Sequence, residues 1–535
     1  MTKNLILWII SLAIMFSSAK MVFTAEEYVK IGIDNEWNQP RPDKADLSVV
    51  YIKRLPRYPG NQSTYKHIDE GEGGYLGDLL PPIITNKDAK KNPQAGDEVT
   101  FYAYVKNKGP VTVQSYDWHW LIDGRDVKSG IAGAIKLNEQ HVYELKWKWQ
   151  DGAHFVSFEV DRRRLLDEIT RNNNFVADQT NALAFHFFVE ESVYKWFDTV
   201  KNGLGSYCWE DWAQLQVREM NRMFRDSIYP STPNGIEERV RLDEVTIIPD
   251  GWGDKGGTHT PFVKTPVNYD NPEFVNANEK KPGTVGFGNG TGGTDGVWGF
   301  TVDLLKPDAD GLHFYTKVTR WLTGPEWPLH HELGHQLGRA DHYLVPISPE
   351  KNKAVPGMGY PCPQFFRDSM MFSGNYAHDE NIGRNRKKWD STYRFYDEYT
   401  SRGFNRDKGV RRGMFGEYSI DVPTKNTFTF VDEQGTPLAE ANVSLHRVIG
   451  HGYTNGTVSD KPAYTGKTDK DGSWMLTKPV YDIQLCWMSN AAIFFLVEKD
   501  GRKYGGFTDV SELNLEYWRG NKDNAKITII VKPVP

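Results

Sequence analysis

Cysteine is scarce in this chain, which has 3 among its 535 residues. A fold stapled by disulfide bonds is therefore excluded, and hydrophobic cores have to supply the stability. The odd count leaves at least one cysteine without a partner in the same chain. Cys208 and Cys362 both lie in the central region and could form one bridge.

An excess of one charge and long apolar runs are also lacking. The 64 basic residues oppose 70 acidic ones, so the sequence does not predict nucleic-acid binding. One apolar run, residues 5–16, follows Lys3 and precedes the small residues 17–19. This order is typical of a signal peptide with its cleavage region in residues 1–25, and the run is short of the ~20 residues that span a bilayer. We expect a secreted protein, outside the cell, at its surface or in the periplasm, without stable membrane insertion after cleavage; an uncleaved anchor is the alternative.

Length and aromatic content predict several domains, because 535 residues, 13% of them aromatic, are too many for one core. Residues 46–190 and 417–535 are rich in the short alternations typical of strands, whereas residues 194–415 mix helix and strand patterns. The fold class that we predict is multidomain α+β, with a β-sandwich on each side of a mixed domain.

The first β-rich region has strand and turn signals at regular spacing. Three segments alternate between apolar and polar residues: residues 99–105, 118–122 and 140–149. Asp123-Gly124 and Asp151-Gly152 are hairpin signals between apolar runs. The motifs GDEV at 96–99, VKNKG at 105–109 and the asparagine pair at 172–173 resemble the bacterial cell-adhesion-related domain CARDB. The resemblance implies an accessory domain for attachment to a cell surface or glycan.

The last β-rich region also reads as strands. The strand-like segments are residues 428–431, 441–446 and 526–531. The motifs VDEQG at 431–435 and TDKDG at 468–472 resemble transthyretin-like or carboxypeptidase-regulatory-like β-sandwiches. Residues 308–311 and 469–472 match fragments of calcium loops, but both lack the full ligand set, so we expect tight turns, with Ca²⁺ as the alternative.

Two helices and a strand are predicted in the middle region. A one-sided apolar stripe predicts a helix over residues 209–226, and residues 240–248 read as a strand. A second helix should begin near Trp327, because Pro328 suits its first turn.

This second helix carries the motif HELGHQLGRAD, which begins at His331 and ends at Asp341. Residues four apart share one face of a helix, so His331 and His335 can bind one metal ion. Glu332 lies beside that face, where its carboxylate can act as a general base on a metal-activated water. Gly338 can take a positive φ and end the helix, so that Asp341 returns as third ligand. Three protein ligands leave the fourth zinc position open, as in catalytic sites.

The motif resembles the HExxHxxGxxH signature of the metzincin zinc peptidases, with Asp341 where most members have histidine. The snapalysin-like branch has aspartate there. Metzincins also place a methionine turn under the zinc, and Ser369-Met370-Met371 is similar to its Ser-x-Met sequence. The resemblance implies a zincin-type catalytic domain with one zinc ion, and makes Met371 a support and not a ligand.

Other side chains near the motif leave alternatives open. His342 is the alternative third ligand, and His330, out of phase with His335, is expected to pack. Some metzincins have a tyrosine ligand two residues after the methionine. That position is Ser373 here, and Tyr343 and Tyr376 are the nearest substitutes.

We therefore expect a zinc endopeptidase that hydrolyses protein or peptide substrates. One alternative is a gluzincin-type peptidase directed at mucins or other glycoproteins, with Glu350 as third ligand. The other is a non-catalytic adhesion or glycan-binding surface protein with a vestigial peptidase core. Every proposed ligand and the base lie between His331 and Met371, so residues 194–415 are predicted to carry the chemistry without the flanking sandwiches.

Overall fold

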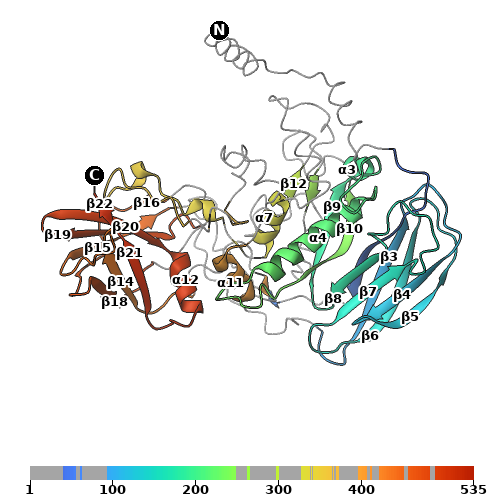
Figure 1. Ribbon diagram of the computed structural model, residues 1–535, viewed down its shortest axis with the longest axis horizontal. Helices are drawn as coiled ribbons and strands as arrows, with labels where there is room; N and C mark the ends of the chain where they lie inside the picture. Colours follow the sequence, from blue (N-terminus) through green and yellow to red (C-terminus); the bar gives the residue numbers. More distant parts are fainter. Residues whose placement is uncertain are drawn as a thin grey trace, which may run out of the picture.

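The computed structural model describes residues 40–55, 61–62, 93–248, 262–264, 297–299, 327–337, 339, 341–363, 366, 369–372, 396–406, 410–411, 421–450, 456–481 and 488–534. The expected signal segment, residues 1–25, lies outside this part of the chain. The fold is multidomain and mixed, with three units that follow one another along the long axis of the molecule (Figure 1). Among the described helices, none has the length and apolar character needed to cross a bilayer.

The N-terminal sandwich consists of two antiparallel sheets around one core, with strand orders β1-β3-β6 and β5-β4-β7-β8. Its strands are β1 (Leu47–Leu55), β3 (Glu98–Asn107), β4 (Tyr116–Ile122), β5 (Arg125–Ala132), β6 (Gln140–Lys148), β7 (Phe155–Val160) and β8 (Phe175–Gln179). Buried residues alternate along β3, and Trp120 packs edge-on against Phe158 with ring centroids 4.8 Å apart. The three alternating segments are thus confirmed as β3, β4 and β6.

The two expected Asp-Gly turns differ in role. Asp123 and Gly124 have positive φ values of 49° and 76° and join β4 to β5, as a tight hairpin requires. The prediction of a hairpin at Asp151-Gly152 is wrong, because β6 and β7, which this turn connects, lie in different sheets. The turn instead carries the chain from one layer of the sandwich to the other.

A mixed sheet with order β10-β9-β11-β12 lies at the centre of the molecule. The elements here are β9 (Leu183–Glu190), α3 (Glu191–Trp196), α4 (Trp209–Asp226), β10 (Val240–Ile248), β11 (Phe262–Lys264), β12 (Val297–Gly299), α7 (Trp327–Gln336), the short 3₁₀ turns η4 (His342–Leu344) and η5 (Pro349–Lys351), and α11 (Glu398–Arg406). The predicted helix 209–226, strand 240–248 and helix start at Trp327 are confirmed. Because β9 pairs in parallel with β10, it belongs to this central unit and not to the sandwich, where a boundary at residue 190 would put it.

Helices α4 and α7 are held by one shared hydrophobic cluster. Trp209 and Trp212 of α4 and Leu329 and Leu333 of α7 are buried in it together. Leucines four apart fix one face of α7 against the core. His331, two residues from each, therefore points away from that face.

The C-terminal sandwich has one sheet of order β18-β14-β21 and one of order β16-β15-β19-β20-β22, with β17 on β15. Its elements are β14 (Asn426–Val431), β15 (Asn442–Ile449), β16 (Thr457–Val458), β17 (Tyr464–Lys467), β18 (Ser473–Leu476), β19 (Ala492–Lys499), β20 (Arg502–Asp509), α12 (Val510–Trp518), β21 (Ala525–Ile530) and β22 (Lys532–Pro533). The three predicted strand segments are confirmed as β14, β15 and β21. Asp469 accepts the backbone N–H groups of Asp471 and Ser473, so residues 469–472 form the expected tight turn. Residues 308–311 lie outside the described part.

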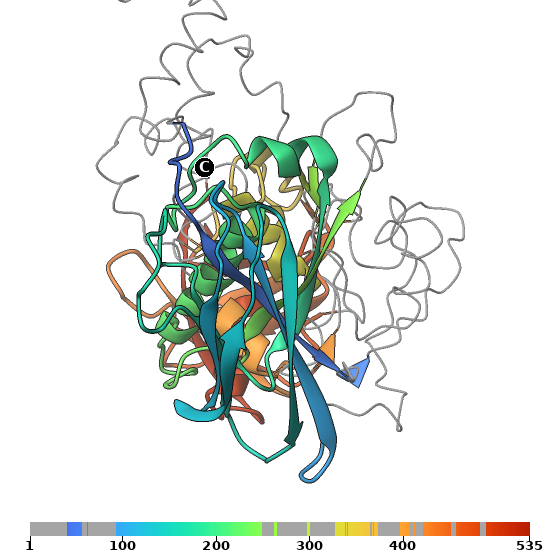
Figure 2. The same ribbon diagram turned by 90° about the vertical axis from the view of Figure 1, so that its right-hand side faces the viewer.

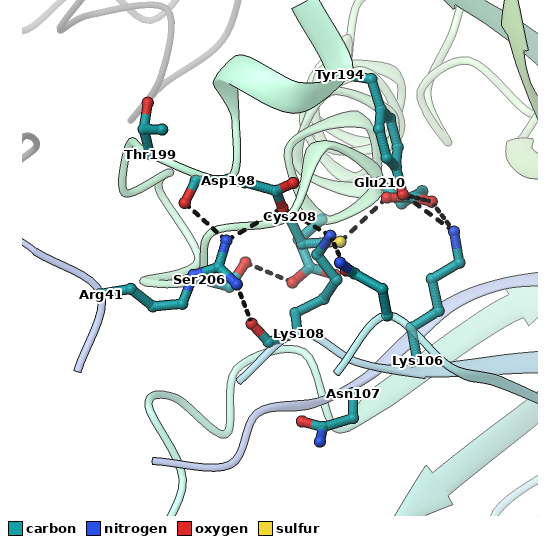
Figure 3. A network of polar contacts seen from close by, with 12 residues as sticks. Arg41, Lys106, Asn107, Lys108, Tyr194, Asp198, Thr199, Ser206, Cys208 and Glu210 are labelled. Atoms are coloured by element: carbon teal, nitrogen blue, oxygen red, sulfur yellow. Dashed lines mark hydrogen bonds and ion pairs between the residues drawn. The ribbon is translucent and has the colours of Figure 1, made fainter. Parts of the chain in front are cut away.

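Buried charges join the N-terminal sandwich to the central unit, and Figure 3 shows them at the start of α4. Lys106 of β3 donates to Glu210 over 2.5 Å, and Tyr194 donates to the same carboxylate over 2.9 Å. Lys108 donates to Asp198 over 2.8 Å. Burial acts to raise the pKa of Glu210, but the two lysines outweigh it and hold the pKa at about 2.

A second buried carboxylate extends this contact. Asp211 of α4 accepts hydrogen bonds from Ser48 of β1 and from Asn173, which precedes β8. Both partners belong to the sandwich, and in Figure 2 the sandwich lies in front of the central helices. The C-terminal side is joined by a mixed cluster as well, in which Val345 and Tyr399 of the central unit pack with Met488 of the C-terminal sandwich. The central unit therefore shares buried surface with both of its neighbours.

Candidate functional site

The motif helix α7 lies directly on the Ser-x-Met turn. Gly334 of α7 faces Met371 so closely that an added Cβ would lie 2.4 Å from its Sδ atom, and Met371 is fully buried. At the C-terminal end of the helix, the backbone N–H of Arg339 donates to the Gly334 carbonyl over 3.0 Å, as in a Schellman motif. The loop that this hydrogen bond closes includes Gly338, the residue that was expected to end the helix. Gly338 itself lies outside the described part.

His331 is anchored by the turn. Its Nδ1 lies 2.8 Å from the carbonyl oxygen of Met370, and His331 is only 7% exposed. A carbonyl oxygen can only accept, so Nδ1 carries the proton. In the neutral imidazole the lone pair is then on Nε2, the nitrogen that a metal would use.

Asp341 meets that nitrogen. Its Oδ1 lies 3.1 Å from His331 Nε2, and its Oδ2 accepts a hydrogen bond from Tyr343 over 2.6 Å. The Tyr343 ring also stacks beside the His331 imidazole, with centroids 6.4 Å apart. The hydroxyl of Tyr343 thus binds the proposed ligand Asp341. Tyr343 therefore lies next to the metal position, and does not occupy the additional ligand position considered for it from the sequence.

The pair fits two ligands of one zinc ion. Two atoms bound to zinc at about 2.0–2.2 Å with tetrahedral angles lie roughly 3.4 Å apart. The observed separation of 3.1 Å between Nε2 and Oδ1 is close to this distance. The chemistry agrees, because a buried lone pair facing a buried carboxylate is unfavourable until a proton or a cation lies between them.

His342 and His330 face other partners. The His342 ring packs against Phe366 with centroids 4.2 Å apart, and its Nδ1 lies 3.5 Å from Asp397. Burial lowers the pKa of His342 to about 4. His330 donates from Nε2 to the Gln216 carbonyl of α4 over 3.0 Å, which agrees with the packing role expected for it.

Glu332 and His335 lie on α7, one and four residues after His331, but their side chains are outside the described part. Within that part, no three His, Cys, Asp or Glu side chains gather as a metal site. Ser373 and Tyr376 also lie outside it.

Glu350 is exposed on η5 and accepts a hydrogen bond from Ser348 over 2.5 Å. Its position on the surface contrasts with the burial of His331 and Asp341.

No disulfide joins Cys208 to Cys362, so the bridge considered from the sequence is not formed. The two thiols are buried in different hydrophobic clusters, and burial raises the pKa of Cys208 well above its usual value.

Residues 77–178 match the family model of CARDB. The chain contains a CARDB domain. The CARDB domain of a Pyrococcus furiosus protein, solved in complex with di-metal ions, is 16% identical over 26% of this chain and 94% of that one, with a TM-score of 0.18. A domain of a putative cell surface protein from Methanosarcina acetivorans is 18% identical over 15% of this chain and 72% of that one, with a TM-score of 0.14. No curated protein matches the chain significantly.

The structure adds residues that the motifs alone did not reveal. The Met370 carbonyl and the Tyr343 hydroxyl hold His331 and Asp341, and Asp397 binds Ser369 of the turn. A backbone carbonyl leaves no trace in residue type. Asp397, by contrast, stands three residues before Thr400 in an N-cap arrangement, a signal that is visible in the sequence.

Proposed function

We propose that the chain is a secreted zinc endopeptidase, with zinc held by His331, His335 and Asp341. The observation that carries the proposal is the pair of His331 Nε2 and Asp341 Oδ1, which face each other at 3.1 Å while Nδ1 is held by Met370. The motif helix and the Ser-x-Met turn, about forty residues apart in sequence, are in contact as a metzincin-type centre requires.

Zinc, when bound, supplies a Lewis acid that polarises the scissile carbonyl and makes a water molecule more acidic. Glu332 is the general base: it accepts the proton of the attacking water and later delivers it to the departing amine nitrogen. The water oxygen bonds to the carbonyl carbon, the C–N bond breaks, and a carboxylate and an amine result. Met370 and Tyr343 keep His331 and Asp341 in the ligand orientation.

The two alternatives receive less support. The gluzincin alternative needs Glu350 as a buried ligand, whereas this residue is exposed on η5. The adhesion alternative assumes a vestigial core, whereas Glu332 and the proposed ligands His331, His335 and Asp341 are all present in the sequence. We propose instead that the CARDB domain and the C-terminal sandwich, with its transthyretin-like motifs, position the enzyme on large or surface-bound substrates.

Zinc content and casein hydrolysis of the full chain test this proposal. We expect about one zinc ion per chain, hydrolysis that a chelator abolishes, and recovery on zinc addition. Hydrolysis that persists after complete removal of the metal would contradict a zinc mechanism. Stoichiometric zinc without any hydrolysis of unfolded substrates would favour the vestigial, adhesive alternative.

A further inference from the structure

Asp397 binds two segments that build the candidate metal centre, and caps a helix at the same time. Its Oδ1 accepts the backbone N–H of Thr400 over 3.0 Å, which caps α11. Its Oδ2 accepts the hydroxyl of Ser369, in the Ser-x-Met turn, and lies 3.5 Å from Nδ1 of His342, next to Asp341. Asp397 is 1% exposed, and Ser369 and His342 are equally buried.

The turn extends this contact to the proposed ligand His331 and to His342, the neighbour of Asp341. The Ser369 hydroxyl also accepts from the backbone N–H of Met371 over 3.3 Å, so it fixes the turn internally. The Met370 carbonyl then accepts from His331, and the Met371 carbonyl accepts from the backbone N–H of His342 over 2.9 Å. A continuous series of hydrogen bonds therefore runs from Asp397 through the turn to the proposed ligand His331 and to His342, the neighbour of the proposed ligand Asp341.

We propose that Asp397 is a positioning residue of the metal centre, which sets the geometry of His331 and Asp341 through Ser369 and His342. The inference rests on the proposed zinc site and deepens it. The backbone cap needs only Oδ1, whereas Oδ2 accepts the hydroxyls of Thr400 and of Ser369 in the turn and lies near His342 in the loop that carries Asp341. Loss of that oxygen's charge loosens the turn, and the ligands that it holds lose their preorganisation.

The chain offers a matched control for this proposal. Asp509 is also fully buried, caps α12 by accepting the N–H of Ser511 over 2.8 Å, and accepts a hydroxyl, that of Tyr360, over 2.7 Å. It lies in the C-terminal sandwich. Asp397→Asn and Asp509→Asn therefore make the same substitution at two buried N-cap residues, one beside the proposed metal centre and one in the C-terminal sandwich.

The experiment measures zinc affinity by competition with a chromophoric chelator in the full-length wild type and both variants, together with their thermal unfolding midpoints. We expect Asp397→Asn to weaken zinc binding by about 10–100-fold, and Asp509→Asn to leave zinc affinity unchanged while lowering the midpoint. Equal zinc affinities in the two variants, with wild-type binding intact, would overturn the positioning role and leave the zinc site standing. A wild-type chain that binds no zinc would overturn the zinc site itself, and the inference with it.

Ser369→Ala keeps the test decisive if Asp397→Asn does not fold. It removes the bond between the turn and Asp397 but leaves the cap of α11 intact. Zinc affinity should fall in Ser369→Ala alone. Where Asp397→Asn does fold, the double variant should bind zinc little more weakly than the weaker-binding of the two single variants. Additive losses, or no loss in Ser369→Ala, would contradict the proposed series of hydrogen bonds.

Discussion

His331 donates a hydrogen bond from Nδ1 to the carbonyl oxygen of Met370 over 2.8 Å, and this contact joins the HExxH helix to the Ser-x-Met turn. It fixes both the orientation and the tautomer of the imidazole. The opposite nitrogen then meets Asp341, whose second oxygen is held by Tyr343. Two of the three proposed ligands are thus oriented by groups that do not touch the metal position.

Tyr343→Phe should weaken zinc binding by about 10–100-fold, because Asp341 loses the donor that holds its Oδ2. Tyr360→Phe is the control, since it removes a tyrosine hydroxyl that donates to Asp509 in the C-terminal sandwich. Chelator competition on both variants measures the effect. A larger loss of affinity in Tyr360→Phe than in Tyr343→Phe would exclude Tyr343 as the residue that orients Asp341.

Glu332→Gln should retain zinc and lose peptidase activity by roughly 10²–10⁴-fold, because the amide keeps the shape of the side chain but cannot accept a proton. The measurement is kcat/KM on a quenched peptide at matched zinc content. Turnover near that of the wild type would falsify the assignment of Glu332 as the base.

The isolated segment 194–415 should not fold stably, contrary to what the position of the ligands alone suggests. The isolated segment would expose the hydrophobic cluster that it shares with β1. Glu210 would also lose its partner Lys106, and Asp211 its partner Ser48. In the full chain, Lys106→Met should cost about 3–5 kcal/mol of the free energy of unfolding, as broken buried ion pairs do.

Lys44→Met is the control for this interface, because its ion pair with Asp167 is exposed and should contribute no more than about 1 kcal/mol. Denaturant unfolding of both variants provides the comparison. A segment 194–415 that unfolds cooperatively on its own, or equal costs for the two variants, would show that the interface is dispensable.

Stability should fall with rising pH because of Asp178 in β8. Burial, the largest cause, raises the pKa of this carboxyl to about 7, against the lowering effect of Arg241 and Arg218. Between about pH 4 and pH 7 the unfolded chain loses this proton while the folded chain keeps it, so the folded state loses up to about 4 kcal/mol from this group. Asp178→Asn should therefore gain stability over the wild type from pH 4 to pH 8.

Asp167→Asn provides the control, because it makes the same substitution at an exposed carboxyl. Unfolding free energies at pH 5 and pH 8 are the measurement. If the difference between Asp178→Asn and wild type does not change between these two values, the carboxyl is not protonated in the folded state.

Local signals in the sequence predicted individual helices and strands. Long-range contacts, which those signals do not encode, decide which sheet a strand joins and which partner a buried side chain binds. The stripe of Trp209 and Trp212 predicted α4, and Pro328 predicted the start of α7, because periodicity and turn chemistry act over a few residues. The turn at Asp151 was misread, since a turn signal does not specify which sheet the next strand joins. The role of Asp397 depends on a partner 28 residues away, which no local pattern encodes.

X-ray absorption at the zinc edge of the zinc-loaded full chain tests the central claim most directly. The account predicts two imidazole nitrogens and oxygen ligands at about 2.0–2.2 Å, with no sulfur. One imidazole should disappear in His331→Ala, whereas His342→Ala should keep both imidazole ligands. A three-imidazole spectrum in the wild type that loses one imidazole in His342→Ala would contradict Asp341 as the third ligand.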